Sequence, residues 1–244
     1  MPAPSKPLPE VSFFAEVDAR LAHYDLLPHP YYRAWSNGEL TRDDLREYAS
    51  EYWHHVSAFP AYLSALHSRL PDSQLRRTVL AYLADEEGLA DGCPHSDLWM
   101  DFAKGMGAEE SEVRSRELNV ETRDLLAHFR AAMASSPAAA LAALYAYESR
   151  VPAIAATKAK GLELHYGADA AATRYFRIHT TADVHHAQVW RDALATELAD
   201  HPENTDDAFA AAESASQALW ITLDGIENAR QRAQDEKGTA PSAA

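Results

Sequence analysis

Cysteine is almost absent from this chain of 244 residues: Cys93 is the one example, so no disulfide can form within the chain. This scarcity favours a reducing compartment, because proteins of oxidising compartments commonly use cysteine for disulfides. The chain also lacks an uninterrupted apolar run of the about 18 residues that a membrane-spanning helix needs. Its beginning, MPAPSKPLPE, carries proline where a signal peptide has its apolar segment. These absences predict a cytoplasmic protein.

Basic residues are scarce as well. Lys and Arg number 22 against 37 Asp and Glu, which gives a formal net charge of −15. Nucleic acids and anionic membranes attract basic surfaces, so we expect neither as a partner. A small-molecule substrate or another protein remains. The 12 histidines are numerous for this length, and they bear on function only where several of them converge.

Alternating and β-branched segments are nearly absent, and apolar residues recur with a period close to 3.6, which predicts an all-α protein. No internal Gly-, Pro- or Ser-rich linker divides the chain, so we expect a single domain over residues 11–237, with a disordered arm at 1–10 and a disordered tail at 238–244. The spacing predicts seven or eight main helices. The longer ones are expected over residues 11–27, 41–70, 72–89, 109–134, 137–166, 169–198 and 205–237.

The stretch HTTADVHHAQ interrupts an otherwise apolar helix face. On a helix His179, Asp183 and His186 lie within about 60° of one another, whereas His185 points elsewhere. Buried ionisable groups cost free energy unless they are paired or bind a metal ion. A single core histidine is more often hydrogen-bonded than metal-bound, but three such groups in register favour a metal site.

Two further carboxylates interrupt core faces in the same way. Glu148 follows an uncharged segment, and Pro152 cannot donate to its carbonyl oxygen, so we expect the helix to bend there. In the 72–89 helix, Glu86 lies on the same face as the apolar residues expected in the core. Its neighbour Glu87 is the alternative inward carboxylate. His95 begins the next helix, close enough in sequence to fold back toward Glu86.

The chemistry of these side chains suits a pair of metal ions. Carboxylate oxygens mixed with imidazoles are ligands for Fe or Mn. The carboxylate-x-x-His spacing also occurs in carboxylate-bridged dinuclear proteins. We therefore predict six metal ligands, listed here: Glu86, His95, Glu148, His179, Asp183 and His186.

A rival carboxylate-x-x-His pair is less favoured. Glu51 and His54 have this spacing, but their helix face also carries Asp44 and Glu47 and is typical of a solvated surface. Cys93 is a weak candidate nucleophile, because it lies in a predicted loop with no obvious base beside it.

With these residues in hand, the chain resembles the haem-oxygenase-like superfamily that includes TenA and PqqC. Within it the chain is similar to the dimetal oxidases, in the branch of the chlamydial protein associating with death domains. The resemblance extends from about residue 25 to 200. It is carried by residues 29–40, 51–66, 85–107, 145–162 and 175–188.

This resemblance implies a bundle of about seven helices, usually a homodimer, around two metal ions, Fe(II)/Fe(II) or Fe/Mn. Such proteins are oxidoreductases that activate O2 with an external reductant. Members of the branch make para-aminobenzoate for folate synthesis and use one of their own tyrosines as the source of the ring. The matching residues here are Tyr31 or Tyr32 for the consumed ring, Tyr147 as a second cavity tyrosine and Lys158 as amine donor.

Other functions stay open at this point. Relatives with the same ligands oxidise and fragment amino acids or fatty acids. A metal-free enzyme of this fold, thiaminase-like or pyrroloquinoline-quinone-synthase-like, would need a cavity cysteine or a cavity rich in Arg and His. A helical interaction module would leave Glu148 and the patch at 179–186 unexplained.

Overall fold

The computed structural model describes residues 10–239 apart from residues 72, 90 and 91. These residues form α-helices, two short 3-10 helices and connecting loops, with no strand among them, which confirms the all-α prediction. The helices are α1 (Glu10–Leu21), η1 (Ala22–Tyr24), α2 (Pro30–Asn37), α3 (Arg42–His67), α4 (Ser73–Glu86), α5 (His95–Gly105), α6 (Glu110–Ser115), α7 (Val120–Ala134), α8 (Pro137–Glu148), α9 (Val151–His165), α10 (Ala170–Asp200), η2 (Pro202–Asn204) and α11 (Thr205–Thr239).

The predicted domain, residues 11–237, begins and ends slightly inside the first and last observed helices. Helix α1 already includes Glu10, and α11 continues through Thr239 instead of ending at 237. An acidic residue in a first turn is favoured by the helix dipole, which explains why Glu10 is helical. The remainder of the predicted arm, 1–9, and of the tail, 240–244, lies outside the described residues.

The structure has more helices than the about seven predicted, because long predicted helices are divided. The segment 109–134 becomes α6 and α7, and Arg116 between them has an extended backbone. The segment 137–166 becomes α8 and α9, separated at Ser149 and Arg150. This second break lies where Pro152 leaves the Glu148 carbonyl without its helical donor, so the predicted bend is a full interruption.

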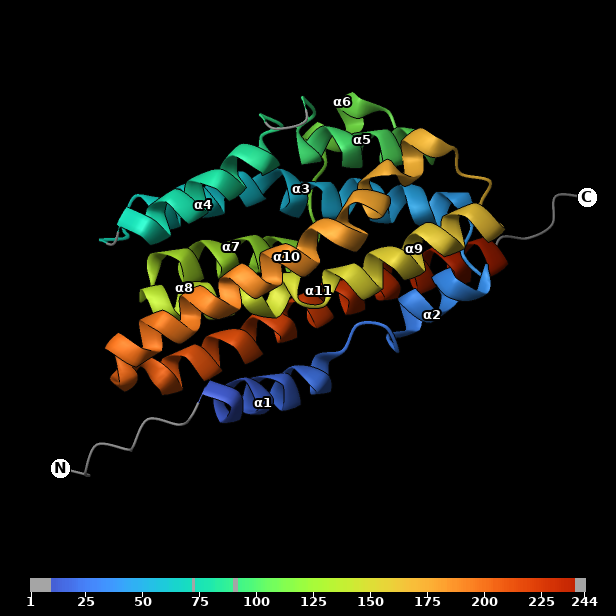
Figure 1. The fold of residues 1–244 in the computed structure, drawn as a ribbon. Helices are drawn as coiled ribbons and strands as arrows, with labels where there is room; N and C mark the ends of the chain where they lie inside the picture. The colour runs from blue at the N-terminus through green and yellow to red at the C-terminus, as the bar shows by residue number, and fades with distance from the viewer. Residues whose placement is uncertain (1–9, 72, 90–91, 240–244) are drawn as a thin grey trace, which may run out of the picture.

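Helix α8 lies at the centre of the bundle. It packs against α10 on one side and α11 on another, and α10 also contacts α5 and α9 (Figure 1). From Ala138 to Ala146 every residue of α8 is buried, and many are alanines that let neighbouring helices approach closely. Glu148 at its end therefore points into a core that is apolar on all sides of the helix.

Helix α3 supplies an aromatic wall to this core. It begins at a capping box in which Thr41 accepts from the Asp44 N–H and Asp44 accepts from the Thr41 N–H. Tyr48 and Tyr52, one turn apart, are both buried and stack on each other with ring centroids 5.6 Å apart. Helices α5 and α7 cover α3, so these rings face the interior of the bundle.

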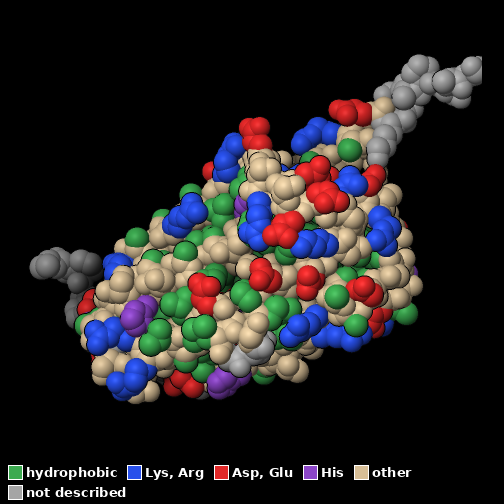
Figure 2. All heavy atoms as spheres, turned by 90° about the horizontal axis from the view of Figure 1, so that it is seen from above, with side chains coloured by type: hydrophobic (Ala, Val, Ile, Leu, Met, Phe, Trp, Pro, Cys, Tyr) green, Lys and Arg blue, Asp and Glu red, His purple; other side chains and the backbone are tan. Residues whose placement is uncertain are grey.

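On the face shown in Figure 2, Lys and Arg side chains are interspersed with Asp and Glu side chains. The net negative charge is therefore not gathered into one acidic field on that face. None of the helices in the described part of the chain is long and apolar enough to cross a membrane.

A close contact between α2 and α9 gives a test of this packing. A Cβ added at Gly161 would lie 2.6 Å from Cδ1 of the buried Trp35, whose indole N–H donates to the Lys158 carbonyl at 3.2 Å. Alanine favours helix over glycine by about 1 kcal/mol, but overpacking costs about 1–3 kcal/mol. We expect Gly161→Ala to lower the free energy of unfolding by about 1 kcal/mol, measured by urea denaturation. A stabilised variant would contradict the packing described.

Candidate metal centre and aromatic cavity

The six predicted ligands converge inside the bundle from α4, α5, α8 and α10. They form two groups, and within each group one ligand atom per residue lies within 4.8 Å of the others. Each of the six residues is buried, with 3–6% of its surface exposed. The groups are Glu86 with His95 and His179, and Glu148 with Asp183 and His186. His185, by contrast, is exposed, as its helical position predicted.

The loop after α4 returns the chain so that His95 meets Glu86. Gly88 has a left-handed backbone (φ +70°), and a Cβ there would lie 2.3 Å from the Cys93 carbonyl carbon. Only glycine fits this close approach. His95 then begins α5 with its Nδ1 3.1 Å from Glu86 Oε1, while Glu87 is exposed. The geometry therefore favours Glu86 over Glu87 as the inward carboxylate.

His179 is held in one orientation by α10 itself. Its Nδ1 lies 2.7 Å from the Tyr175 carbonyl oxygen of the preceding turn, so Nδ1 carries the proton and donates. This leaves Nε2 as the nitrogen that can bind a cation. The Tyr175 ring stacks on the imidazole at 3.9 Å, and the His95 ring lies 4.7 Å away.

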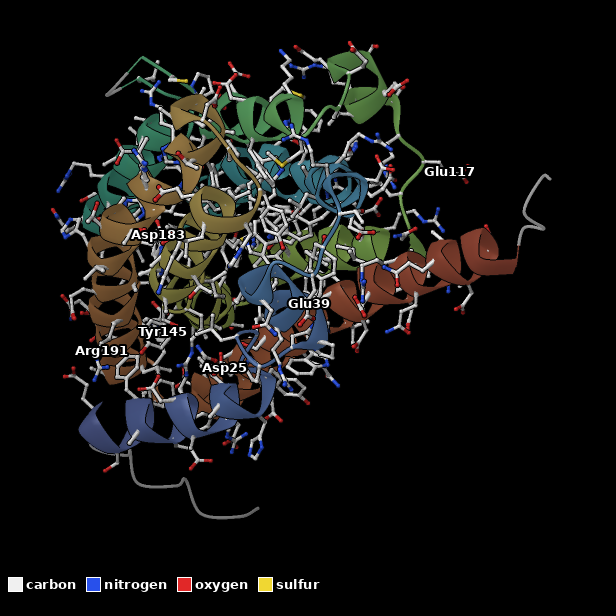
Figure 3. All side chains as sticks on the ribbon, turned by 90° about the vertical axis from the view of Figure 1, so that its right-hand side faces the viewer. Asp25, Glu39, Glu117, Tyr145, Asp183 and Arg191 are labelled. Atoms are coloured by element: carbon white, nitrogen blue, oxygen red, sulfur yellow. The ribbon has the colours of Figure 1, made fainter. Side chains whose placement is uncertain are left out.

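The second group is held by neighbouring indole and phenol rings. Asp183 Oδ1 lies 3.1 Å from His186 Nδ1, and Glu148 Oε2 lies 3.7 Å from the same nitrogen. Trp190, one turn after His186, donates its indole N–H to Glu148 Oε2 at 2.7 Å. Tyr82 of α4 packs on both rings, 4.2 Å from His186 and 4.7 Å from Trp190. Figure 3 locates Asp183 on α10.

The buried carboxylates have opposite pKa shifts. Burial, together with the charges of Asp183 and Glu86, raises the pKa of Glu148 well above its ordinary value. Burial also acts to raise the pKa of Glu86, but the hydrogen bond and charge of His95 outweigh it, so the pKa is lowered. The three carboxylates repel one another in a dry interior, and a cation between them removes that repulsion. Oxygen and imidazole ligands in these proportions fit two divalent ions such as Fe or Mn.

An aromatic cavity adjoins this cluster. Tyr147 and Tyr175 line both the cavity and the small pocket that contains Glu86, Glu148, His179 and Asp183. The cavity continues between α2, α3 and α9. Its other aromatic walls are Tyr24, Tyr32, Tyr52, Trp99 and Phe176.

The two neighbouring tyrosines of α2 point to different places. Tyr32 lines the aromatic cavity, and its hydroxyl lies 3.3 Å from the Tyr48 hydroxyl. Tyr31 instead donates to the Asp44 carbonyl at 3.0 Å and borders a charged cleft on the outside of the bundle. The geometry thus favours Tyr32 and is against Tyr31 as the cavity ring.

Lys158 is enclosed by aromatic rings. Its Nζ lies 4.4 Å from the centroid of the Tyr32 ring and 4.7 Å from that of Tyr48, and it donates to the Tyr48 hydroxyl. Burial lowers the pKa of this amine well below its ordinary value. Burial likewise raises the pKa of the Tyr32 phenol, although the Tyr48 hydrogen bond partly opposes this. The structure thus places an amine whose charged form is disfavoured by burial against a phenol ring.

The rival pair on α3 has a structural role. Glu51 is 1% exposed, so the prediction of a solvated face is wrong at this position. Its carboxylate accepts from Arg116 at 2.7 Å and from the Asn119 N–H at 2.7 Å, which ties α3 to the α6–α7 connection. His54 Nε2 lies 2.9 Å from the Val113 carbonyl oxygen. Cys93 is half-buried in the loop before α5 and, among the described residues, is not part of the cavity lining.

Sequence reasoning missed several groups that hold the site. From the sequence, nothing distinguished these groups from ordinary core residues. They are Tyr48, Tyr52, Trp99, Tyr175 and Trp190. Tyr175 and Trp190 lie on the ligand face of α10, four residues before His179 and four after His186. That helical spacing was the available signal, since residues four apart share a face.

Solved structures define the fold class. A protein of heme oxygenase-like fold from Shewanella denitrificans superposes with a TM-score of 0.79 at 18% sequence identity. The match covers 98% of this chain and 100% of that one. The chain therefore has the haem-oxygenase-like fold, as the sequence resemblance predicted.

Sequence comparison identifies the family. Residues 46–220 match the family of iron-containing redox enzymes. The 4-aminobenzoate synthase of Nitrosomonas europaea is 40% identical over 227 residues, which cover 88% of this chain and 91% of that protein. The 4-aminobenzoate synthase of Chlamydia pneumoniae is 35% identical over 222 residues, covering 90% and 97%. The chain belongs to this family of iron-containing redox enzymes.

The opposite pKa shifts predict opposite effects of two matched substitutions on the metal-free protein at pH 7. The raised pKa of Glu148 means that its contribution to stability is present at low pH and lost as pH rises through the folded-state pKa. The lowered pKa of Glu86 means that its contribution is present above the unfolded-state pKa and lost as pH falls. Glu148→Gln should stabilise the protein and Glu86→Gln should destabilise it, each by about 1–3 kcal/mol.

Urea denaturation in the presence of a chelator measures both changes. The two variants differ from each other only in position, so a general effect of Glu→Gln would move both in one direction. A shift of the same sign in both variants would contradict the electrostatics described.

Proposed function

We propose that this protein is a 4-aminobenzoate synthase that holds two metal ions and uses its own Tyr32 as the source of the aromatic ring. The observation that carries the proposal is the contact between Lys158 and the Tyr32 ring, 4.4 Å from Nζ to the centroid, in a cavity that borders the carboxylate–histidine cluster. The names and 35–40% identities of the relatives support the same reaction.

The six clustered ligands would hold the ions in two adjacent sites. Glu86, His95 and His179 would bind one ion, and Glu148, Asp183 and His186 the other, as Fe(II)/Fe(II) or Fe/Mn. When bound, such a pair supplies activation of O2 with electrons from an external reductant. The Trp190 indole N–H, which donates to Glu148 Oε2, would fix the orientation of this carboxylate.

Tyr32 is presented as a neutral phenol in a fixed orientation. Its hydroxyl is hydrogen-bonded to Tyr48, and its ring lies between Lys158 and the cavity. Tyr147 and Tyr175 stand between this ring and the ligands, since both line the cavity and the ligand pocket. These rings exclude bulk water from the path between the metal ions and Tyr32.

Lys158 would supply the amino nitrogen: the phenolic oxygen of Tyr32 would leave as water when the ring carbon–nitrogen bond forms, and the Cε–Nζ bond of Lys158 would then be cleaved oxidatively with O2 and the reductant. A protonated amine has no lone pair to form a carbon–nitrogen bond, so the burial that lowers its pKa prepares it as a nucleophile. The Tyr48 hydroxyl, which accepts from Lys158 and contacts the Tyr32 hydroxyl, orients both reactants. Tyr48 is thus a positioning residue for the pair.

Metal content gives the first test. Protein reconstituted anaerobically with Fe(II), alone or with Mn(II), should bind about two ions per chain, measured by elemental analysis after desalting. Glu86→Gln should lose about one of them, because one of three ligands in its group is weakened. Its exposed neighbour supplies the matched control: Glu87→Gln should retain both ions. Absence of bound metal in the wild-type protein would reject the proposal.

The tyrosine assignment gives the second test. Tyr32→Phe should abolish 4-aminobenzoate formation in reconstituted protein supplied with reductant and O2, since the phenol oxygen and its contact with Tyr48 are lost. Tyr31→Phe should keep at least about half of the wild-type yield, because its hydroxyl faces the Asp44 carbonyl outside the cavity.

Product is measured by chromatography, and the intact mass of the chain before and after reaction reports loss of ring atoms in the same sample. Undiminished product from Tyr32→Phe would contradict the use of this ring. Full activity of Tyr32→Phe, together with no product and no loss of mass in Tyr31→Phe, would reverse the assignment.

A further inference from the structure

The aromatic cavity has an unusual charge for this protein. The chain carries 37 acidic residues against 22 basic ones, yet no Asp or Glu is among the described residues that line the cavity. One cationic residue does line it, Arg150, whereas burial disfavours the charged form of the Lys158 amine in the same lining. A cavity with cationic and no anionic lining favours negatively charged small molecules over neutral ones.

Arg150 has no part in the proposed formation of the ring–nitrogen bond. It lies at the interruption between α8 and α9, and its Nε is buried with no hydrogen-bond partner. One terminal nitrogen donates to the Asp18 backbone carbonyl at 3.4 Å, whereas the Asp18 carboxylate accepts from the Tyr145 hydroxyl instead. The guanidinium therefore has a buried donor without an acceptor, a costly arrangement unless a ligand supplies one.

The surroundings of Arg150 also favour an anion. Arg150 is the N-cap of α9, and Val151, the first residue of that helix, lines the same cavity. The positive end of a helix dipole attracts negative charge. Tyr24 and Arg150 are half-exposed whereas Lys158 is buried, so the Arg150 end is where the cavity approaches solvent. Helix α1, whose Asp18 carbonyl accepts from Arg150, passes near the labelled Tyr145 in Figure 3.

We propose that Arg150 binds the carboxylate of a small aromatic acid at the outer end of the cavity, and that this acid is the 4-aminobenzoate product on its way out. The inference rests on the proposed function for the identity of the acid. The enclosed free space of the cavity is small, about 40 Å³, so the ring of the acid would lie at the mouth of the cavity, where Tyr24 and Arg150 are partly exposed. A guanidinium–carboxylate pair supplies the orienting contact, and Tyr24 and the apolar walls contact the ring.

Direct binding tests this assignment without any catalytic turnover. Metal-free, full-length protein is titrated by calorimetry with 4-aminobenzoate and with 4-aminobenzamide, a neutral molecule of nearly the same shape. The acid should bind about 10-fold or more tightly than the amide, because only the acid forms a charge-assisted pair. Arg150→Gln should remove this preference and leave binding of the amide within about 2-fold.

Two further variants separate the role of charge from a general effect. Arg150→Lys should restore part of the preference, since it keeps the charge and loses the planar fork. Arg174→Gln removes an exposed arginine of α10 and should bind both molecules as the wild type does. Equal binding of acid and amide by the wild type, no binding of either, or an unchanged preference in Arg150→Gln would overturn the inference.

These outcomes are independent of the proposed function. Formation of 4-aminobenzoate by the wild-type protein and its loss in Tyr32→Phe judge the reaction. The acid–amide preference judges Arg150. An active enzyme without this preference would keep the synthase proposal and reject the carboxylate site. An inactive protein that shows the preference would reject the synthase proposal and keep the carboxylate site.

Discussion

The burial of three carboxylates in one apolar core is the constraint on which the rest of the structure depends. Glu148 ends a helix that is largely buried and uncharged, and burial, together with the charges of Asp183 and Glu86, raises its pKa. A globular protein gains nothing for its own stability from such a cluster, because each charge loses its hydration. The imidazoles offset part of this cost, as the His95 contact with Glu86 does. A pair of divalent cations would offset the remainder.

The low polarity of the neighbouring cavity disfavours a charge, whereas the ligand cluster gathers charged groups. Around Lys158 the walls are aromatic rings, and burial among them lowers the pKa of its amine. Around the ligand cluster, carboxylates are gathered so that cations are attracted. One bundle therefore keeps an amine whose charged form is disfavoured and a carboxylate–histidine cluster in adjoining spaces. Tyr147 and Tyr175, which contact both spaces, separate the two environments.

Helix periodicity was sufficient to predict from the sequence that Glu148, His179, Asp183 and His186 face inward. The interruption of apolar faces by His179, Asp183 and His186, and of α8 by Glu148, is a local signal that survives folding unchanged. Local sequence did not decide whether Glu86 or Glu87 faces inward, because this depends on how the loop at Gly88 turns back toward α4. The predicted homodimer and cytoplasmic location remain predictions.

Other features could not be read locally because they depend on partners far along the chain. Glu51 looked solvated until Arg116, from the distant α6–α7 connection, covered it. Tyr31 and Tyr32 are adjacent, and only the packing of α2 against α3 and α9 decides which ring faces inward. Arg150 is an ordinary basic residue in the sequence. Its importance follows from the helix interruption that places it at the cavity.

The two halves of the ligand cluster differ in composition, and this difference has a chemical consequence. One half offers a single carboxylate with two imidazoles, and the other offers two carboxylates with one imidazole. Two divalent cations carry a charge of +4 against −3 for the ionised carboxylates, so the filled centre would hold a small positive excess. The half with Glu148 and Asp183 is the harder and more anionic of the two. Since Mn(II) prefers hard oxygen ligands more than Fe(II) does, an Fe/Mn pair would place Mn there and Fe beside the two imidazoles.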